Sequence, residues 1–516
     1  MGRGSVGVTA IGQPQWGFDP NSGPTNNIPR AGGNGWIPVK PDGSRVNNSA
    51  DRSFVGNVRN PTTLDYYSRT DPAGLGFTRT FPGAATYCLA NANLPQNNPA
   101  GGCLEDNRQA TQQVQPAQET GSFFARATKA ITPEIEGFLE FGFYHAKTSV
   151  NLPPIATNGA YFTADGAAHS QTAVTQLGAS HPDNPYFGTP ARLAYQGLFD
   201  YGSAPVDSTS HAIRFVGGVK GTWSGFDFDT GVTYSEARQT DTSKNTINWR
   251  VKNALFDPSP ANVAIATAFS PAYAALPAGT VWRIGENAGL NSPAMYAAVL
   301  ANQERNGFSK LYGADFKVSR EFGQLAGGPI GVAVGAEVRR ESNELPLYTG
   351  FGDFVGLSLT AYGGSRNIYA TYAEVALPVL KQLELSAALR YDHYTDAGDS
   401  LTPKFGAKWR VVSNFALRGT YAQAFRAPSS TENSPTSIAA FGGPAINDTA
   451  RCASLAGLPQ ATIDANCKGI SPTFVQRGNP DLKPEKSDSY TLGLVWDLTP
   501  KSSITADLWR IKRKGL

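Results

Sequence analysis

The chain has 516 residues, with 44 Lys or Arg against 41 Asp or Glu, a net charge of +3. This near balance disfavours a nucleic acid as the main partner, because nucleic-acid binding needs a basic stripe. Charged residues are only 16%, while 55 glycines, 36 prolines and 11% aromatic residues indicate an all-β protein with many turns and exclude a mainly helical one.

Alternating segments occur in pairs along the chain. In each segment apolar or aromatic residues alternate with small, polar or charged residues, which is the period of a strand with one apolar and one polar face. Leu383, Leu385 and Leu389, for example, alternate with Glu384 and Arg390. The pattern predicts about twelve strands, in hairpins near 122–146, 211–237, 309–340, 367–393, 402–425 and 488–512.

The connections between these segments are unequal in length, and short and long ones take turns. The short ones are Ser224-Gly225, 378–382, Ser413-Asn414 and 499–502. The long, polar ones fall within 11–121, 151–209, 240–307, 341–366 and 426–486, far beyond ordinary loop lengths. Short turns on one rim and long loops on the other are typical of a bacterial outer-membrane β-barrel, whereas alternation alone also fits a soluble sandwich.

One long loop contains a predicted short helix over 292–304. Ser292 is a suitable N-cap, and Pro293 occupies the first helical position, where its missing N–H costs nothing.

Aromatic residues collect near the predicted strand ends, as in the two interfacial girdles of a membrane barrel. The alternative is ordinary aromatic packing in a soluble core. The candidates are Trp223, Tyr234, Tyr369, Tyr391, Tyr394, Trp409, Tyr421, Trp496 and Trp509.

The four cysteines form two pairs of equal spacing, Cys88 with Cys103 and Cys452 with Cys467. Each pair encloses loop-like sequence, which favours two local disulfides in an oxidising compartment. Four unrelated thiols are the alternative, and the Cys-x-x-Cys spacing of a zinc site is absent.

Motifs for catalysis are nearly absent. The five histidines have no metal-ligand spacing, and there is neither a nucleophile elbow nor a Walker loop. Glu374, Glu384 and Asp392 fall on the polar strand face, where we interpret them as lining charges of a water-filled barrel rather than as a glycosidase pair. The sequence therefore predicts no enzyme activity, no cofactor and no metal.

Two motifs in the C-terminal half resemble those of TonB-dependent outer-membrane receptors. Phe425, Arg426, Ala427 and Pro428 are similar to the family's Phe-Arg-Ala-Pro motif, which closes a strand before an extracellular loop. The second motif, Asn-Pro-x-Leu-x-Pro-Glu, opens the next strand, and its counterparts here are Asn479, Pro480, Leu482, Pro484 and Glu485.

These motif residues have a structural rationale. We expect Arg426 to hydrogen-bond loop carbonyls, and Pro428 to end pairing because it has no N–H for a ladder. Pro480 and Pro484 precede the next paired segment, and Glu485 is expected to cap free N–H groups there. None is assigned to a ligand.

The resemblance implies a transmembrane antiparallel β-barrel of the 22-stranded type, with long extracellular loops and short periplasmic turns. It covers 121–516, while 1–120 match only loosely, as early strands and a long loop. The family's signal peptide, TonB box and plug domain are not visible, and the last strands are missing. We therefore expect a fragment truncated at both ends, which transports nothing by itself.

For the intact family, the resemblance implies an outer-membrane receptor of a Gram-negative bacterium that imports a scarce nutrient, energised through TonB. The expected partners are outer-membrane lipid, the TonB complex and a ligand of the siderophore, cobalamin, haem or oligosaccharide class. A soluble secreted all-β binding or adhesin-like module is the alternative. Loop aromatics that either stack on a ligand or pack on one another are Tyr161, Phe162, Tyr186, Phe187, Trp249, Trp282, Tyr348 and Phe351.

Overall fold

The computed structural model describes most of the chain from residue 115 onward and three short strands before it. The described residues are 27–29, 36–38, 57–59, 115–159, 161–162, 168–169, 176–186, 188–198, 200–357, 359–442, 447–457, 460 and 473–515.

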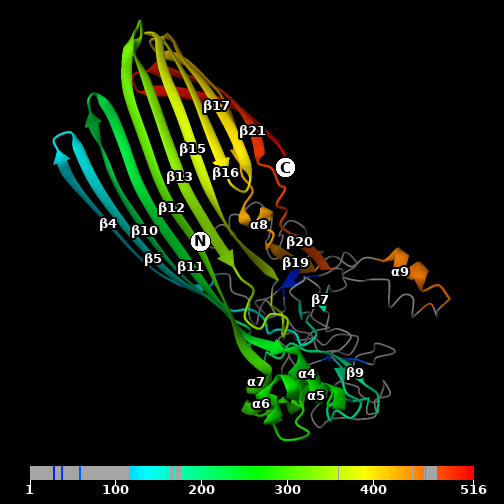
Figure 1. Cartoon of the computed structure of the whole chain (residues 1–516). Coiled ribbons are helices and arrows are strands. Elements are labelled where there is room, and N and C mark those ends of the chain that lie inside the picture. The colour runs from blue at the N-terminus through cyan, green and yellow to red at the C-terminus, as the bar shows by residue number, and fades with distance from the viewer. Residues whose placement is uncertain are drawn as a thin grey trace.

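Twelve long strands form one curved antiparallel sheet in which each strand pairs with its neighbours in chain order (Figure 1). The fold therefore confirms the predicted number of strands and all six hairpins. The strands are β4 (Ala117–Thr132), β5 (Ile135–Val150), β10 (Val206–Trp223), β11 (Phe226–Asn248), β12 (Leu300–Leu325), β13 (Gly328–Leu345), β15 (Thr360–Leu380), β16 (Leu383–Tyr394), β17 (Gly398–Val412), β18 (Phe415–Arg426), β21 (Glu485–Thr499) and β22 (Ser502–Lys514).

Shorter elements lie mainly at the end of the sheet where the long connections emerge. The short strands are β1 (Asn27–Pro29), β2 (Trp36–Pro38), β3 (Asn57–Arg59), β6 (Tyr161–Phe162), β7 (Ala168–His169), β8 (Gln176–Leu177), β9 (Ala191–Ala194), β14 (Phe354–Val355), β19 (Ile438–Gly442) and β20 (Thr473–Arg477). The helices are α4 (Trp249–Phe256), α5 (Pro260–Phe269), α6 (Pro271–Ala274), η3 (Gly285–Leu290), α7 (Pro293–Val299), α8 (Ser430–Asn433) and α9 (Thr449–Ser454).

Two-residue turns join every hairpin at the opposite end of the sheet, which we call the turn side; the other end is the loop side. In the β10–β11 turn, Ser224 and Gly225 both have positive φ, 52° and 76°. Two successive residues of this kind make the tight turn whose twist matches that of the flanking strands. The predicted short connections are present, and those at 378–382 and 499–502 are shorter than predicted, because β15 runs to Leu380 and β21 to Thr499.

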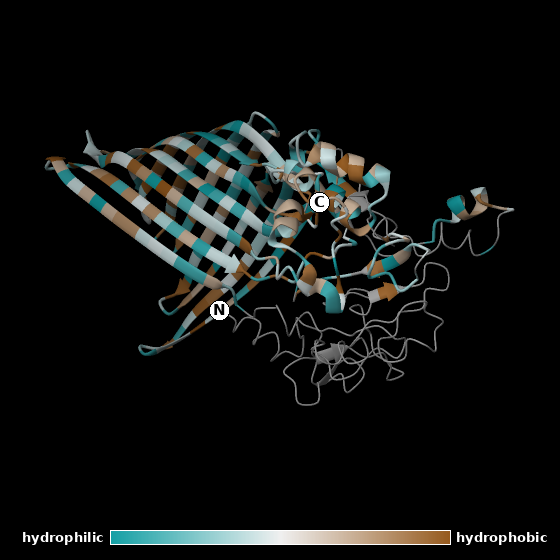
Figure 2. Ribbon diagram, turned by 90° about the horizontal axis from the view of Figure 1, so that it is seen from below, coloured by the Kyte–Doolittle hydropathy of each residue, from teal (hydrophilic) through white to brown (hydrophobic). Residues whose placement is uncertain are grey.

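The sheet has two chemically distinct faces, because successive side chains of a strand point to opposite sides. The apolar face carries residues such as Leu139, Phe215 and Val232, which are 66%, 50% and 62% exposed. The polar face carries cross-strand ion pairs, for example Arg126 with Glu140. Figure 2 shows the resulting alternation of hydrophilic and hydrophobic residues along the strands.

Aromatic side chains of the apolar face form two rows. The row nearer the loop side includes Phe215, Tyr234, Tyr312, Tyr369, Tyr391, Tyr421 and Tyr490, and the row nearer the turn side includes Trp223, Phe226, Phe322, Trp409, Phe415 and Trp496. Two of the predicted girdle residues, Tyr394 and Trp509, lie on the polar face instead of the apolar one. Tyr394 lies against the guanidinium of Arg366 at 5.0 Å, and Trp509 shares the polar face with Asp507, which pairs with Arg418.

The strands extend further toward the loop side than the sequence predicted. β11 runs to Asn248 and β12 begins at Leu300, although 240–307 was expected to be a loop. Polar side chains on both faces hide the alternation there. They bond across strands instead, as Thr240 Oγ1 does to Asn306 Oδ1 at 2.6 Å.

A β-bulge between Ser243 and Thr246 redirects the end of β11 into the next long loop. Asn245 has a positive φ of 53°, which asparagine tolerates better than most residues, and its Nδ2 donates to the Ser203 carbonyl at 2.7 Å. Asn248 then caps α4, because its Oδ1 accepts from the backbone N–H groups of Arg250 and Val251.

The helices of this loop pack into a small unit, which we call the cap, made of β8, β9, β14, α4 to α7 and η3. The predicted helix at Ser292 is present, with Ser292 Oγ accepting from the Met295 N–H at 3.2 Å. It ends at Val299 rather than at 304, since β12 begins at the next residue. In the described part of the chain, none of the helices has the length and apolarity needed to cross a membrane.

The β10–β11 turn gives a direct test of the hairpin geometry. Gly225→Val should lower the free energy of unfolding by about 1–2 kcal/mol, because a branched side chain disfavours positive φ. Urea unfolding followed by tryptophan fluorescence measures it. Gly121→Val, at an open position of β4, is the control and should change little. Equal losses in the two variants would argue against the turn geometry.

Candidate functional site

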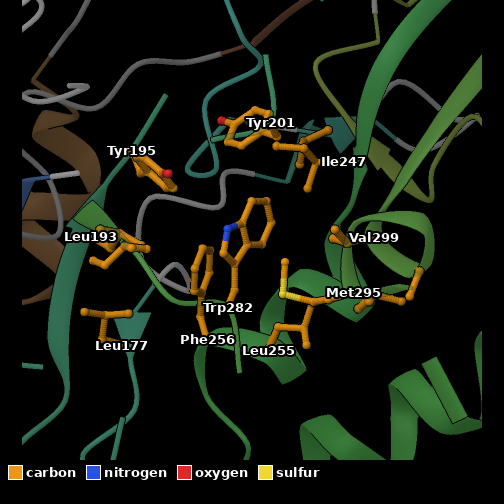
Figure 3. Close-up of a cluster of buried hydrophobic side chains, with 14 of the residues drawn as sticks. Leu177, Leu193, Tyr195, Tyr201, Ile247, Leu255, Phe256, Trp282, Met295 and Val299 are labelled. Atoms are coloured by element: carbon orange, nitrogen blue, oxygen red, sulfur yellow. The ribbon is translucent and has the colours of Figure 1, made fainter. Parts of the chain in front are cut away.

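The cap is built around one buried aromatic cluster. Trp282 is completely buried and stacks on Phe256, with ring centroids 5.0 Å apart. Figure 3 shows Trp282 in the middle of the cluster, among side chains from β8, β9, β11, α4 and α7. Because so large an aromatic group is removed from water, Trp282 stabilises the cap and does not stack on a ligand.

Other loop aromatics also pack on protein groups. Tyr161 stacks on Trp249 at 4.8 Å, and the Arg305 guanidinium lies 4.5 Å from the Tyr348 ring. These loop aromatics therefore pack against other protein groups, and the structure does not leave their rings free to stack on a ligand. Phe187 lies outside the described residues.

A buried ion pair joins two distant parts of the cap. Asp183 is 3% exposed and accepts from Arg283 Nε at 2.9 Å and Nη2 at 2.6 Å. The Ile284 backbone N–H and the Asn287 side-chain amide also donate to this carboxylate, at 2.9 and 2.8 Å. Four donors satisfy the buried charge, which would otherwise be costly.

His181 lies beside this pair and is fully buried. The Asp183 backbone N–H donates to Nδ1 at 3.1 Å, so the ring proton is on Nε2, which donates to the Trp282 carbonyl at 3.2 Å. Burial lowers the pKa of His181 to about 4, against the opposing effect of the Asp183 carboxylate. The imidazole is therefore neutral at pH 7.

A second carboxylate, Asp200, collects hydroxyl and indole donors. Tyr195 Oη donates to it at 2.5 Å and Trp282 Nε1 at 2.8 Å, and Tyr296 Oη also contacts it. Burial raises the pKa of Asp200, although these donors act in the opposite direction. The carboxylate thereby ties β9 to α7 through the core.

Lys252 of α4 is also fully buried, and its ammonium donates to the Thr157 carbonyl at 2.8 Å. Burial lowers the pKa of Lys252 to about 7. The cap thus holds several ionisable side chains away from water, and their hydrogen bonds cross-link loop segments.

The two sequence motifs meet on the loop side of the sheet. Arg426, the last residue of β18, donates to Glu432 at 2.8 and 2.9 Å and to Glu485, the first residue of β21, at 2.5 Å. The described partners of Arg426 are therefore carboxylates, not the loop carbonyls expected from the sequence. Phe425 packs edge-on against Tyr394 at 5.7 Å.

Glu432 has the role that the sequence suggested for Glu485. Its carboxylate accepts from the Ser429 backbone N–H at 2.7 Å, which caps the short helix α8. The Arg426 guanidinium holds the pKa of Glu432 at about 2. Sequence reasoning missed Glu432, although Ser429-x-x-Glu432 is a capping-box pattern that identifies it.

The other motif residues shape the chain between the strands. β18 ends two residues before Pro428, whose carbonyl accepts from Arg366 at 2.8 Å. Asn479 Oδ1 accepts from the Asp481 N–H at 3.0 Å, in the turn that carries Pro480. Ala427, Leu482 and Pro484 lie in the same two connections, and the exposed Leu482 follows this turn. These placements agree with structural roles, which stay proposals.

Cys452 lies in α9 and is disulfide-bonded. Cys88, Cys103 and Cys467 lie outside the described residues, so both predicted pairings stay predictions.

The polar face forms a wall of paired charges with hollows along it. One hollow of about 810 Å³ is lined by Asp315, Lys317, Glu337, Glu374 and Arg390, among others. Arg390 bonds both Glu337 and the buried Asp392. Mixed charges at these positions suit contact with a polar solute and give no nucleophile with an adjacent base. No group of three or more metal-ligating side chains occurs among the described residues.

Residues 281–516 match the family described as "TonB dependent receptor-like, beta-barrel". The match covers a little less than half of the chain and supports the resemblance to the β-barrel domain of TonB-dependent receptors. The recognised resemblance and the fold class are thus confirmed. Because the family is one of receptors, the expectation that the protein is not an enzyme is confirmed as well.

Two named proteins can be compared with this chain, one of them both by sequence and by structure. The probable TonB-dependent siderophore receptor PirA of Acinetobacter baumannii is 27% identical over 146 residues, which are 28% of this chain and 17% of that protein. Two solved structures are similar. The ferric enterobactin receptor PfeA of Pseudomonas aeruginosa has 14% identity and a TM-score of 0.44, covering 79% of this chain and 44% of that one. The siderophore receptor PirA of A. baumannii has 13% identity and a TM-score of 0.40, covering 77% and 43%. The chain spans less than half the length of these relatives.

Removing the charge from the buried Asp183–Arg283 ion pair should have a large effect on the stability of the cap. Asp183→Asn should destabilise the cap by about 3–5 kcal/mol, because it leaves the Arg283 guanidinium without its carboxylate. Hydrogen exchange of the α4 to α7 amides measures the loss. Asp481→Asn, at an exposed carboxylate, is the control. Unchanged protection in Asp183→Asn would contradict this account of the pair.

His181 should make the stability of the cap depend on pH. Its folded pKa is below the ordinary value of 6.5, so only the unfolded state takes up a proton between about pH 6.5 and pH 4. The contribution of His181 to stability should therefore fall by about 3 kcal/mol as the pH drops through this window. Above the window the His181 contribution stays constant, and the lowered pKa of Lys252 makes stability rise further between about pH 7 and 10.5. The same exchange experiment at a series of pH values measures this. His181→Gln keeps both hydrogen bonds and should lose most of the slope; an unchanged slope would contradict the assignment.

Proposed function

We propose that this chain forms part of an outer-membrane receptor of a Gram-negative bacterium, which binds a scarce nutrient and imports it with energy delivered through TonB. The apolar face of the sheet is the observation that carries the proposal. Leu389, Leu492 and Leu508 are 47%, 58% and 74% exposed on it, and aromatic rows border it on both sides. An apolar surface of this extent marks contact with lipid or with another protein, and the two aromatic rows favour lipid.

The cap and the polar wall support the receptor part of the proposal. The cap lies at the loop side of the sheet, where a ligand from outside arrives first (Figure 1). The wall behind it offers paired charges and hollows to a polar ligand. Siderophore, cobalamin, haem and oligosaccharide ligands all fit this description. The relative found by sequence is a probable TonB-dependent siderophore receptor, which favours the siderophore class for this chain.

A soluble secreted binding module is the second candidate. Such a fold buries one face of its sheet against a second layer, whereas here the apolar face is exposed along the described strands. The observation therefore favours the membrane protein.

Neighbouring residues on opposite faces of β11 test the membrane placement. Val232→Lys should reduce membrane assembly, because a lysine on the lipid face costs about 2–4 kcal/mol near the midplane. Thr233→Lys, one residue along and on the polar face, is the matched control and should assemble like the unmodified chain. The amount of urea-resistant protein in the outer-membrane fraction measures both. Equal assembly of the two variants, or recovery of the unmodified chain in the soluble fraction, would contradict the proposal.

Energisation through TonB has its own test. Cells that carry the full-length gene should take up an iron-loaded siderophore, and a proton-motive-force uncoupler should abolish uptake while surface binding persists. Uptake that resists the uncoupler would indicate a passive pore.

A further inference from the structure

The apolar face carries a groove of about 880 Å³ that crosses β4, β5 and β10 to β13. Its floor includes the small residues Ala127, Gly217 and Ala314, and its walls include Leu139, Phe215 and Tyr312. These positions lie in register across the strands, so the groove is continuous. A Cβ atom on Gly217 would stand 3.0 Å from Leu139 Cδ2, so glycine at this position leaves space on the floor of the groove.

The groove opens away from the polar wall. Leu139 and Phe215 alternate along their strands with Glu140 and Arg214, which approach each other on the polar face at 4.0 Å. A ligand that moves along the wall of the barrel therefore does not meet this groove. Whatever occupies it comes from the medium that surrounds the apolar face.

Cationic side chains border the groove at its loop-side rim. Arg340 stands directly opposite Tyr312, is exposed, and has no carboxylate partner among the described residues; it donates to Asn367 at 3.4 Å. One register position further toward the loops, Lys310 lies 3.8 Å from Glu236, which also pairs with Arg238. Lys310 and Arg238 thus share one carboxylate, and Arg340 pairs with none among the described residues, so this rim retains a positive surplus.

We propose that the groove and its rim bind a phosphate-bearing lipid of the surrounding membrane, with an acyl chain in the groove and the phosphate against Arg340 and Lys310. The inference rests on the proposed function, in which the apolar face meets lipid. A free phosphate gains nothing from the groove, and an uncharged apolar molecule gains nothing from the cations. A lipid joins both chemistries at the required separation, since headgroups lie just outside an aromatic row.

Native mass spectrometry of the purified full chain in a non-ionic detergent tests the site. The probes are phosphatidylglycerol, phosphatidylcholine with the same chains, and inorganic phosphate. The unmodified chain should retain phosphatidylglycerol in preference to phosphatidylcholine, and millimolar phosphate should not displace it. The double variant Arg340→Gln/Lys310→Gln should bind phosphatidylglycerol about tenfold more weakly.

Arg510→Gln is the matched control, because Arg510 stands opposite Tyr490 on β22 as Arg340 stands opposite Tyr312, but outside the groove. It should retain the lipid. Ala314→Phe, which fills the groove, should lower retention of both lipids. If the double variant and Arg510→Gln lose the same amount of bound phosphatidylglycerol, there is no defined site and the chain attracts anionic lipid in general. If inorganic phosphate displaces the lipid, the ligand is not a lipid.

Flotation of the same variants with phosphatidylcholine vesicles separates this inference from the proposed function. If all variants float but lipid retention is unchanged, the lipid site is wrong and the membrane barrel stands. If the unmodified chain does not float, the membrane placement fails and the lipid site fails with it.

Discussion

Pairing of the backbone between adjacent strands is the constraint on which the rest of this structure depends. In a lipid environment an unpaired N–H or C=O group costs several kcal/mol, so a strand can cross only when its neighbours satisfy it on both sides. The interior strands β5 to β21 meet this condition through a ladder that follows chain order. Once the ladder exists, the period of two assigns each side chain to one of the two faces. The apolar face, the aromatic rows and the polar wall all follow from that assignment.

The same constraint explains why the two ends of the sheet differ. At the turn side two residues suffice to reverse an antiparallel pair, and Ser224-Gly225 does so with positive φ angles. At the loop side the chain leaves the ladder for long segments that must provide their own stability. The cap does this with a buried aromatic cluster around Trp282 and with ion pairs such as Asp183 with Arg283. A cap with its own core can hold a fixed shape above the mouth of the sheet, which a recognition surface requires.

Most of the sheet was predictable from the sequence, because alternation is visible wherever one face is apolar and the other polar. The signal fades where both faces meet water, so the polar ends of β11 and β12 were read as loop. The single helix foreseen was the one with a recognisable start, Ser292-Pro293. Helices α5 and α6 begin with the same Ser-Pro signal, at Ser259-Pro260 and Ser270-Pro271, so sequence reasoning missed two helices that this signal marks. Helix α4 has only an asparagine N-cap, Asn248, and no proline at its start. Residue contacts within the motifs were less predictable still: Arg426 meets Glu432 and Glu485, which lie on different segments brought together only by the fold.

Photocrosslinking with a lipid that carries a diazirine in its acyl chain tests the central claim most directly. The chain is reconstituted with this lipid, irradiated and mapped by peptide mass spectrometry. The account predicts labelling with a period of two, at Phe215, Gly217, Val232 and Tyr234 but not at Arg214, Val216 or Thr233 between them. Labelling spread evenly over both faces, or confined to the cap, would contradict an apolar face that meets lipid.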